Sequence, residues 1–308
     1  MNILVSGSIA YDRIMPFPGY FADHIMPDKI HILNVCFLVE GLIEKFGGTA
    51  GNIAYTLALL GEKPEVLATV GKDFGHYEKW MHKHGISLNS IRTIQEELTA
   101  AAYITTDKAD NQITGFNPAA MKYSSQHDFS NLSPENTLAV VSPGNLDDMY
   151  NYSLAYQEKG IRYIFDPGQN IPAFSGEKML EMISGCYILV SNDYELEMIM
   201  KNTGLSKAEL LNHARYIITT LGADGCLVVK KREETRLPAA HVSNVVDPTG
   251  AGDGFRAGLI KGMAEGRPVP EAAKVGLTSA AYPVEHHGTQ EHHFTQEEFW
   301  VRFADNFE

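Results

Sequence analysis

The stretch Val245-Val246-Asp247-Pro248-Thr249-Gly250-Ala251-Gly252-Asp253-Gly254-Phe255-Arg256-Ala257-Gly258 carries the most informative pattern in the chain, and the residues after it are helical in pattern as far as Met263. Its glycines allow the backbone to turn tightly and to approach a ligand closely. Backbone amides at the start of a helix point N–H groups at an anion. The stretch therefore predicts a phosphate-binding helix start with the carboxylate of Asp253 beside it.

Taken alone, Asp253 has a simpler explanation, because an aspartate in the first turn of a helix can serve as its cap. Two common phosphate-binding motifs do not occur: the sequence has no Gly-x-x-x-x-Gly-Lys-[Ser/Thr], and no Gly-x-Gly-x-x-Gly follows the first expected strand. A P-loop enzyme and a nicotinamide dehydrogenase are therefore disfavoured.

Short runs rich in β-branched residues alternate with longer amphipathic stretches along the chain. The expected strands are 3–5, 66–70, 138–141, 163–165, 188–190, 217–220 and 226–229. This alternation predicts an α/β protein with a largely parallel sheet covered by helices. Such sheets bind ligands beyond the carboxyl ends of their strands, where this sequence places many polar residues.

Two stretches, approximately 14–40 and 98–116, interrupt the alternation of strand and helix. We interpret both as excursions that form a small β lid over the ligand cleft; an edge hairpin and a surface loop are the alternative. No internal repeat or flexible linker marks a second domain. Residues 1–308 are therefore expected to form a single domain.

The Asp-x-Thr-Gly-Ala-Gly-Asp pattern of residues 247–253 resembles the second signature of the PfkB, or ribokinase-like, carbohydrate kinases. The segment Phe46-Gly47-Gly48-Thr49-Ala50-Gly51-Asn52-Ile53-Ala54 is similar to the first signature of the same family. The resemblance spans essentially the whole chain, with several motifs in the order typical of the family. It implies a ribokinase-like three-layer sandwich with a mostly parallel sheet and a small β lid.

The resemblance also implies roles for individual residues. Asp253 would be the catalytic base that takes the proton from the acceptor hydroxyl, and the amides of Gly250, Ala251 and Gly252 would form the anion hole. Phosphoryl transfer needs mainly positioning and charge neutralisation, which helix-start amides and a metal can provide.

For the ATP side, Asn192 and Glu195 are similar to the Asn-x-x-Glu element that organises Mg²⁺ and its waters around the nucleotide phosphates. An N-cap asparagine followed by an ordinary helical glutamate is the alternative. Thr220, Gly222 and Gly225 match the Thr-x-Gly-x-x-Gly turn beside ATP.

Asp247 and Thr249, with the later Gly288-Thr289-Gln290, resemble the loops that hold a monovalent cation, expected to be K⁺, beside the anion hole. The last of these loops departs in detail from the more familiar sugar-kinase version.

For the acceptor, the resemblance assigns Asp12 to the vicinal hydroxyls of a ribose, because one carboxylate can accept two hydrogen bonds. Gly48 would let the backbone approach the sugar, and Asn52 would add a donor and an acceptor. Taken singly, each of these residues is explained by a turn or a cap.

The stretch 23–31 resembles the nucleoside-kinase branch, which includes the adenosine kinases, more than ribokinase. We therefore expect an ATP-dependent nucleoside kinase, most of all an adenosine kinase, that phosphorylates the ribose 5′-hydroxyl. A sugar kinase on the same fold is the alternative, and a binding protein without catalysis is disfavoured by the intact Asp253 motif. Phe17 and Phe21 are the candidates for stacking on the base, with core packing as the competing interpretation, and Phe116 and Met121 are candidates for a second wall.

The composition excludes some classes of binding partner and indicates the cellular compartment. The formal charge of −13, from 25 Lys+Arg against 38 Asp+Glu, opposes a broad nucleic-acid surface. Three widely spaced cysteines suit reduced thiols, and no stretch has the length and apolarity of a membrane span or the pattern of a signal peptide. We expect a cytoplasmic protein that binds neither nucleic acid nor membranes. Lid edges mediate dimers in some relatives but not in all, so a homodimer and a monomer are both left open. The pairs His286-His287 and His292-His293 are expected to be solvated loop residues.

Overall fold

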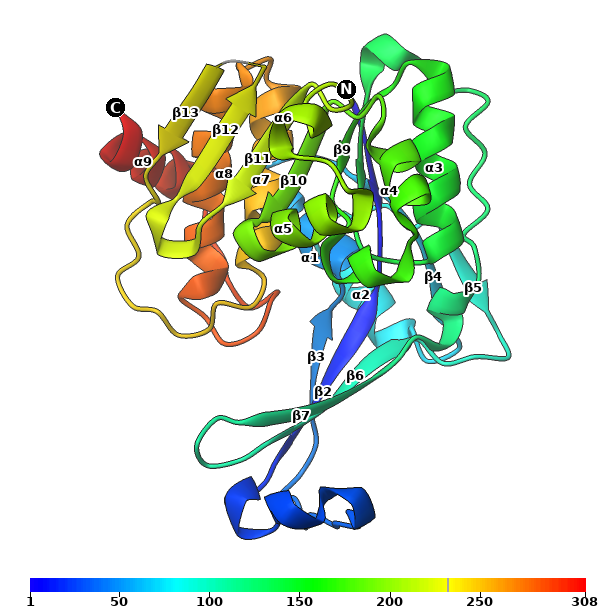
Figure 1. The fold of residues 1–308 in the computed structure, drawn as a ribbon, viewed down its shortest axis with the longest axis vertical. Helices are drawn as coiled ribbons and strands as arrows, with labels where there is room; N and C mark the ends of the chain where they lie inside the picture. Colours follow the sequence, from blue (N-terminus) through cyan, green and yellow to red (C-terminus); the bar gives the residue numbers. More distant parts are fainter. Residues whose placement is uncertain (232) are drawn as a thin grey trace.

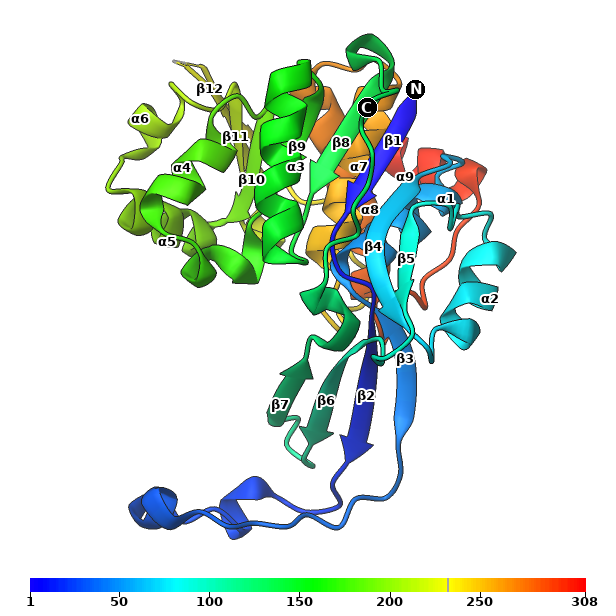
Figure 2. The ribbon, with the colours of Figure 1, turned by 90° about the vertical axis from the view of Figure 1, so that its right-hand side faces the viewer.

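The computed structural model describes residues 1–231 and 233–308. It consists of a large α/β body and an arm-like second sheet that projects from one end of the body (Figures 1 and 2). The predicted architecture, a mostly parallel sheet between two helical layers with a small β lid, is confirmed.

The large sheet has nine strands among the described residues, in the order β13-β12-β11-β10-β9-β8-β1-β4-β5. Neighbouring strands are parallel from β11 to β5, and β12 and β13 add an antiparallel edge. All seven strands expected from the sequence lie in this sheet. The bounds are β1 (Asn2–Ser6), β4 (Glu65–Gly71), β5 (Ile91–Ile94), β8 (Thr137–Val141), β9 (Arg162–Phe165), β10 (Ile188–Asn192), β11 (Tyr216–Thr220), β12 (Cys226–Lys230) and β13 (Glu233–Leu237).

Helices cover both faces of this sheet because its strands are apolar on both sides. Alternate residues of β1 illustrate this: Ile3 and Val5 pack into one core and Leu4 into the other. The first core includes α1 (Thr49–Leu59), α2 (Gly75–Lys83), α7 (Ala251–Ala264) and α8 (Val269–Val284), with α9 (Gln296–Phe307) packed outside α8. The second includes α3 (Leu146–Lys159), α4 (Gly176–Ile183), α5 (Asp193–Thr203) and α6 (Lys207–Leu210).

The lid is a four-stranded sheet in the order β3-β2-β6-β7. Its strands are β2 (Ala10–Pro16), β3 (Ile43–Gly47), β6 (Ala100–Thr106) and β7 (Gln112–Asn117). Both predicted excursions take part in it. The first part of the lid is longer than the predicted range 14–40, because it runs from the start of β2 at Ala10 to the end of β3 at Gly47. Between β2 and β3, the short 3₁₀ turns η1 (Phe21–Asp23) and η2 (Pro27–Ile32) lie at the far end of the arm (Figure 2).

Helix α7, which carries Asp253, packs tightly against α8. At Gly258, an added Cβ would lie 2.7 Å from Cβ of Ser279 on α8, so the close approach depends on the glycine. The first turn of α7 lies at the end of the body from which the lid projects, since Gly250 and Asp253 line the same cavity as Asp12 of β2. Among residues 1–231 and 233–308, no helix combines the length and apolar composition needed to cross a membrane.

Candidate active site

A cavity of about 410 Å³ lies where the lid meets the body. Three segments that are distant in sequence each bring a predicted site residue to it: Asp12 comes from β2, Asn52 from α1 and Asp253 from α7. The remaining lining residues are Ser8, Ala10, Gly48, Thr49, Ala102, Phe116, Met121, Pro143, Gly144, Gln169, Asn170, Thr249, Gly250 and Thr289. The structure thus brings together the acceptor residues and the catalytic motif predicted from the sequence.

The start of α7 has the geometry expected of an anion hole. Gly250 precedes the helix with a φ of 85° and a ψ of −6°, a left-handed conformation that favours glycine. The structure differs from the expectation at Ala251, because its amide already donates to the carbonyl of Pro248 at 3.2 Å. The amides of Gly252 and Asp253 belong to the first turn, whose N–H groups have no acceptor within the helix. They can therefore receive an anion in the cavity.

Asp253 is half-buried in this first turn, and its Oδ2 accepts a hydrogen bond of 2.8 Å from Nδ2 of Asn52. Burial raises the pKa of Asp253 from 3.8 to about 6, against the opposing effects of Arg256 and of the Asn52 hydrogen bond. The carboxyl is therefore ionised near neutral pH and still basic enough to accept a proton, as a general base requires.

Arg256, one turn after Asp253, forms an ion pair with Asp166 at the end of β9, and both side chains are buried. Oδ1 of Asp166 is buried and has no hydrogen-bond partner among the described residues. The pair affects the pKa of Asp253 in both directions, since Arg256 lowers it and Asp166 raises it. Neither residue was predicted to belong to the site; the three-residue spacing from Asp253 to Arg256 is the signal that points to this side of α7.

Asp12 projects from the base of the lid towards the same cavity. Burial and, to a lesser extent, the negative charge of Asp247 raise the pKa of Asp12 from 3.8 to about 6. A Cβ at residue 47 would lie 2.6 Å from Oδ2 of Asp12, so Gly47 leaves room for this carboxylate. Gly48 has a φ of 88°, and a Cβ there would lie 2.6 Å from the carbonyl of Ser8. The backbone at Gly48 therefore needs glycine to reach the cavity.

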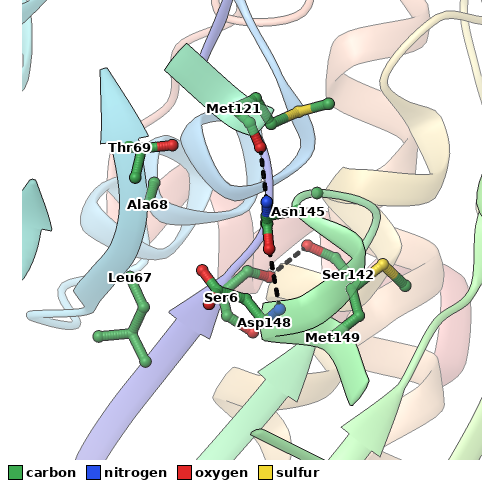
Figure 3. Close-up of a pocket in the computed structure, with 11 residues that line it drawn as sticks. Ser6, Leu67, Ala68, Thr69, Met121, Ser142, Asn145, Asp148 and Met149 are labelled. Atoms are coloured by element: carbon green, nitrogen blue, oxygen red, sulfur yellow. Dashed lines mark hydrogen bonds between the residues drawn. The ribbon is translucent and has the colours of Figure 1, made fainter. Parts of the chain in front are cut away.

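The second wall of the cavity, formed by Phe116 and Met121, is held by the body of the protein. Nδ2 of Asn145 donates to the carbonyl of Met121 at 2.9 Å, while Oδ1 of Asn145 accepts from the amide of Asp148 at 3.0 Å (Figure 3). The hydroxyl of Thr69 donates a hydrogen bond to the neighbouring carbonyl of Ala120 at 2.9 Å. A small cavity of about 10 Å³ lies behind this anchor.

Phe17 and Phe21 do not line the cavity. Their rings stack on each other at 5.8 Å, and Phe37 packs against both at 4.8 and 5.0 Å. Both phenylalanines are buried in this small cluster within the lid. Their expected role in base stacking is therefore wrong for this structure, and core packing is the better interpretation. Phe116, which is 50% exposed, is the aromatic side chain that reaches the cavity.

The residues predicted to bind ATP lie at neighbouring strand ends, outside the lining of this cavity. Asn192 and Thr220 are paired in register across β10 and β11. Asn192 Oδ1 accepts from the amide of Glu195, and Glu195 Oε2 accepts from the amide of Asn192, at 2.7 and 2.8 Å. The turn that follows β11 contains Gly222 and Gly225 with φ of 57° and 85°.

The Asn192–Glu195 pair forms a capping box, so both alternatives considered from the sequence apply to the same residues. Burial raises the pKa of Glu195, and the nearby Asp166 adds to this effect. No group of three or more His, Cys, Asp or Glu side chains has metal-binding geometry in the described part of the chain. The residues present fit a Mg²⁺ ion held largely by water and phosphate oxygens, which this cation prefers.

Asp247 connects the two loops that were expected to hold a monovalent cation. Oδ1 accepts from the amide of Thr249 at 2.9 Å, and Oδ2 accepts from the amide of Gly288 at 3.4 Å. The loops therefore lie together beside Gly250. One expectation for the following segment is wrong: His292 is 1% exposed, and its Nε2 lies 3.1 Å from Oγ1 of Thr56. His292 is a buried packing residue, and burial lowers its pKa to about 3.

Residues 23–295 match the pfkB family carbohydrate kinase, and the chain belongs to this family of phosphotransferases that act on a hydroxyl group. Relatives and solved structures from the nucleoside-kinase branch of the ribokinase family support its place in that branch.

A solved structure of the nucleoside kinase from Burkholderia thailandensis in complex with inosine is 35% identical, with a TM-score of 0.87 over 99% of this chain and 98% of that chain. The same enzyme has been solved in complex with ADP-inosine. The nucleoside kinase of Methanocaldococcus jannaschii is 32% identical over 83% of this chain and 85% of its own length. The ribokinase of Haemophilus influenzae is 26% identical over 80% of this chain and 83% of its own length.

Proposed function

We propose that the protein is an ATP-dependent nucleoside kinase that transfers the γ-phosphoryl group of ATP to the ribose 5′-hydroxyl, with adenosine as the first expected acceptor. The observation that carries the proposal is the meeting of Asp12, Asn52 and Asp253 in one cavity at the start of α7. Asp12 and Asn52 suit the hydroxyls of a ribose, and Asp253 suits the hydroxyl that reacts. The inosine complex of the similar Burkholderia enzyme supports a purine nucleoside as the acceptor class.

In this mechanism Asp253 accepts the proton of the 5′-hydroxyl while the 5′-oxygen forms the new bond to the γ-phosphorus. The bond from that phosphorus to the β,γ-bridging oxygen breaks, and ADP leaves with the electron pair. The first-turn amides of α7 stabilise the charge on the transferred group. Asn192 and Glu195 would hold Mg²⁺ through water, and the ion would neutralise charge on the phosphates when bound.

The direct test is ADP formation with a panel of adenosine, inosine, guanosine, cytidine, ribose and fructose 6-phosphate, with Mg²⁺ present. We expect turnover to be highest with adenosine or another purine nucleoside. If ribose or a phosphorylated hexose is turned over at least as efficiently as every nucleoside, the nucleoside proposal fails. The sugar-kinase alternative then takes its place, since Asp12 and Asn52 could orient a free ribose equally well.

The lid supports the proposal that the enzyme is a homodimer. Its outer strands, β3 and β7, are sheet edges, and β7 is exposed along its whole length. The excursion between β2 and β3, with the first residue of β3, exposes a group of large apolar side chains: Tyr20, Met26, Ile30, Ile32, Leu33, Leu38, Leu42 and Ile43. A second copy of the chain would offer the same edges and apolar side chains, as a two-fold interface requires.

We further propose that residues 1–308 act as one catalytic unit in the cytoplasm, because both the lid and the body supply residues to the cavity. The three cysteines are free thiols, with Cys186 and Cys226 buried and Cys36 exposed, which suits a reducing compartment. Fractionation of the cells that produce the protein tests the compartment.

A further inference from the structure

A chain of buried side chains leads from Asp253 through Asn52 into the protein interior. Gln290, in the loop before α9, donates from Nε2 to Oδ1 of Asn52 at 3.0 Å and also to the hydroxyl of Tyr77 on α2. Trp80, also on α2, donates from its indole Nε1 to Oε1 of Gln290 at 3.0 Å. Gln290, Asn52 and Tyr77 are 3%, 5% and 0% exposed, so water competes little for these bonds.

The indole of Trp80 determines which way the Gln290 amide faces. An indole N–H can only donate a hydrogen bond, so the Gln290 atom that faces it must be the oxygen. Nε2 of Gln290 must then face Asn52 and Tyr77. The opposite orientation would place two donors against each other and leave buried polar groups without partners, at a substantial cost.

Tyr77 fixes the same orientation from the other end. Its hydroxyl donates to the carbonyl of Gly47 at 3.0 Å, and that carbonyl can only accept. Having given its one hydrogen to Gly47, the hydroxyl of Tyr77 can only accept from Gln290. Both hydrogens of the Gln290 Nε2 group therefore have acceptors, one on Tyr77 and one on Asn52.

The orientation of Gln290 in turn decides what Asn52 presents to Asp253. Because Oδ1 of Asn52 accepts from Gln290, Nδ2 of Asn52 faces the other way and donates to Oδ2 of Asp253 at 2.8 Å. If the Asn52 amide were reversed, its oxygen would face the carboxylate and the two acceptors would repel each other. The base thus depends on a donor that is oriented from the body of the protein.

We propose that Gln290 is a positioning residue for phosphoryl transfer: oriented by Trp80 and Tyr77, it fixes the Asn52 amide so that this amide holds Asp253 in place and ionised. The inference rests on the proposed role of Asp253 as the base. Gln290 itself does not line the cavity, so its effect passes through Asn52.

The charged groups around Asp253 are Arg256 on the same helix, Asp166 at the end of β9 and Asp12 on β2. Substitutions at residues 80 and 290 leave all three in place. The Asn52 hydrogen bond favours the ionised form of Asp253, so its loss should raise the pH at which the base becomes protonated. The acid limb of the pH profile of kcat therefore reports the orientation of Asn52.

Two variants test the proposal. Gln290→Met keeps the length of the side chain and removes every hydrogen bond of the amide. Trp80→Phe keeps Gln290 and removes the N–H that orients it, together with part of the ring that stacks on Phe46 and Tyr55. We expect kcat of Gln290→Met to fall on the order of 10-fold or more, and its acid limb to move up by about one pH unit. Trp80→Phe should show smaller changes in the same directions.

Gln157→Met is the matched control, because Gln157 also donates to a buried tyrosine hydroxyl, that of Tyr163 at 3.0 Å, but does so from α3. It should lower the melting temperature without moving the pH profile. If Gln290→Met and Trp80→Phe both keep the kcat and acid limb of the wild type, Gln290 is a packing residue and the inference is overturned. If Gln290→Met does not fold, the pH profile of Trp80→Phe decides alone.

Asp253→Asn, measured beside them, separates this inference from the proposed function. If Asp253→Asn is inactive while the Gln290 and Trp80 variants behave as wild type, only the positioning role fails. If Asp253→Asn stays active, the assignment of the base fails, and with it the premise of the inference.

Discussion

Nδ2 of Asn52 lies 2.8 Å from Oδ2 of Asp253, although the two residues are 201 positions apart in the sequence. This hydrogen bond joins the first turn of α1 to the first turn of α7, the two helix starts that border the cavity. The proposed acceptor site and the proposed catalytic base therefore share one contact, and substitutions on either side of it can be told apart by what they change.

Asp253→Asn should lower kcat by about 10²–10⁴-fold or more, because the amide cannot accept the hydroxyl proton. Nucleoside binding, measured by calorimetry, and the melting temperature should change little. In the wild type, kcat should fall as the pH drops through about 6, the pKa to which burial raises Asp253, because the protonated acid is no longer a base. Retention of more than a tenth of wild-type activity in Asp253→Asn would exclude Asp253 as the base.

Asp12→Asn should weaken nucleoside binding by about 10- to 100-fold, the range for a hydrogen bond to a charged group. A 2′-deoxynucleoside should bind the wild type more weakly, and Asp12→Asn should discriminate less between the two ligands. Equal discrimination by wild type and variant in calorimetry would remove Asp12 from the ribose site.

The same substitution should change how stability depends on pH. The pKa of Asp12 is raised from 3.8 to about 6 in the folded state, so its contribution to stability is present below about 4 and is lost as the pH rises through 6. Asp12→Asn has no carboxyl group to ionise, so the variant does not lose this stability as the pH rises. Its melting temperature relative to wild type should therefore be higher at pH 7 than at pH 4, and Gln157→Asn should show no such trend.

Phe116→Ala should raise KM for purine nucleosides much more than KM for ribose, because Phe116 is the aromatic side chain at the cavity. Stacking of a base is worth about 1–3 kcal/mol, which corresponds to about 5- to 150-fold. Phe17→Ala is the matched control: it should lower the melting temperature by disrupting the cluster with Phe21 and Phe37 without a selective effect on nucleosides. The reverse pattern would return the base-stacking role to Phe17.

Potassium should activate the enzyme when it replaces sodium at constant ionic strength, since Asp247 and Thr249 lie in the loop beside the anion hole. Asp247→Ala should abolish the difference between the two salts. Initial rates in KCl and NaCl measure the effect. Equal wild-type rates would leave Asp247 as a carboxylate that only joins its loop to Gly288.

The dimer is tested by light scattering over a range of protein concentrations. Ile32 and Leu38 are 66% and 86% exposed on the lid, so Ile32→Glu combined with Leu38→Glu should shift the protein towards the monomer. Tyr194→Glu, at a 70% exposed residue of α5, should leave the mass unchanged. A wild type that is monomeric at every concentration, or a double variant with an unchanged mass, would contradict the proposal.

The parts of the fold that depend on local pattern could be predicted from the sequence. The strands of the parallel sheet are buried on both faces and are therefore continuous apolar runs, and the start of α7 has its own glycine motif. The convergence of Asp12, Asn52 and Asp253 was predicted through the family resemblance, because spacing along the chain says little about which loops meet.

The contacts that were missed depend on tertiary packing. The pairing of Arg256 with Asp166 crosses from a helix to a distant strand, and no local period indicates it. Phe17 and Phe21 were placed beside the base because an aromatic lid suits a nucleobase, but the same pattern also describes side chains that pack on each other. His292 lies in a polar stretch, and only the fold places it against Thr56.

Strand β3 continues directly into α1 through Gly47 and Gly48, while β2 carries Asp12 at the end of the lid that adjoins the body. The arm and the acceptor site are thus built from the same two lengths of chain. A movement of the arm relative to the body would therefore displace Asp12, on β2, relative to Asn52 and Asp253, on α1 and α7. The position of the arm would thus set how the side chains of the proposed acceptor site face one another.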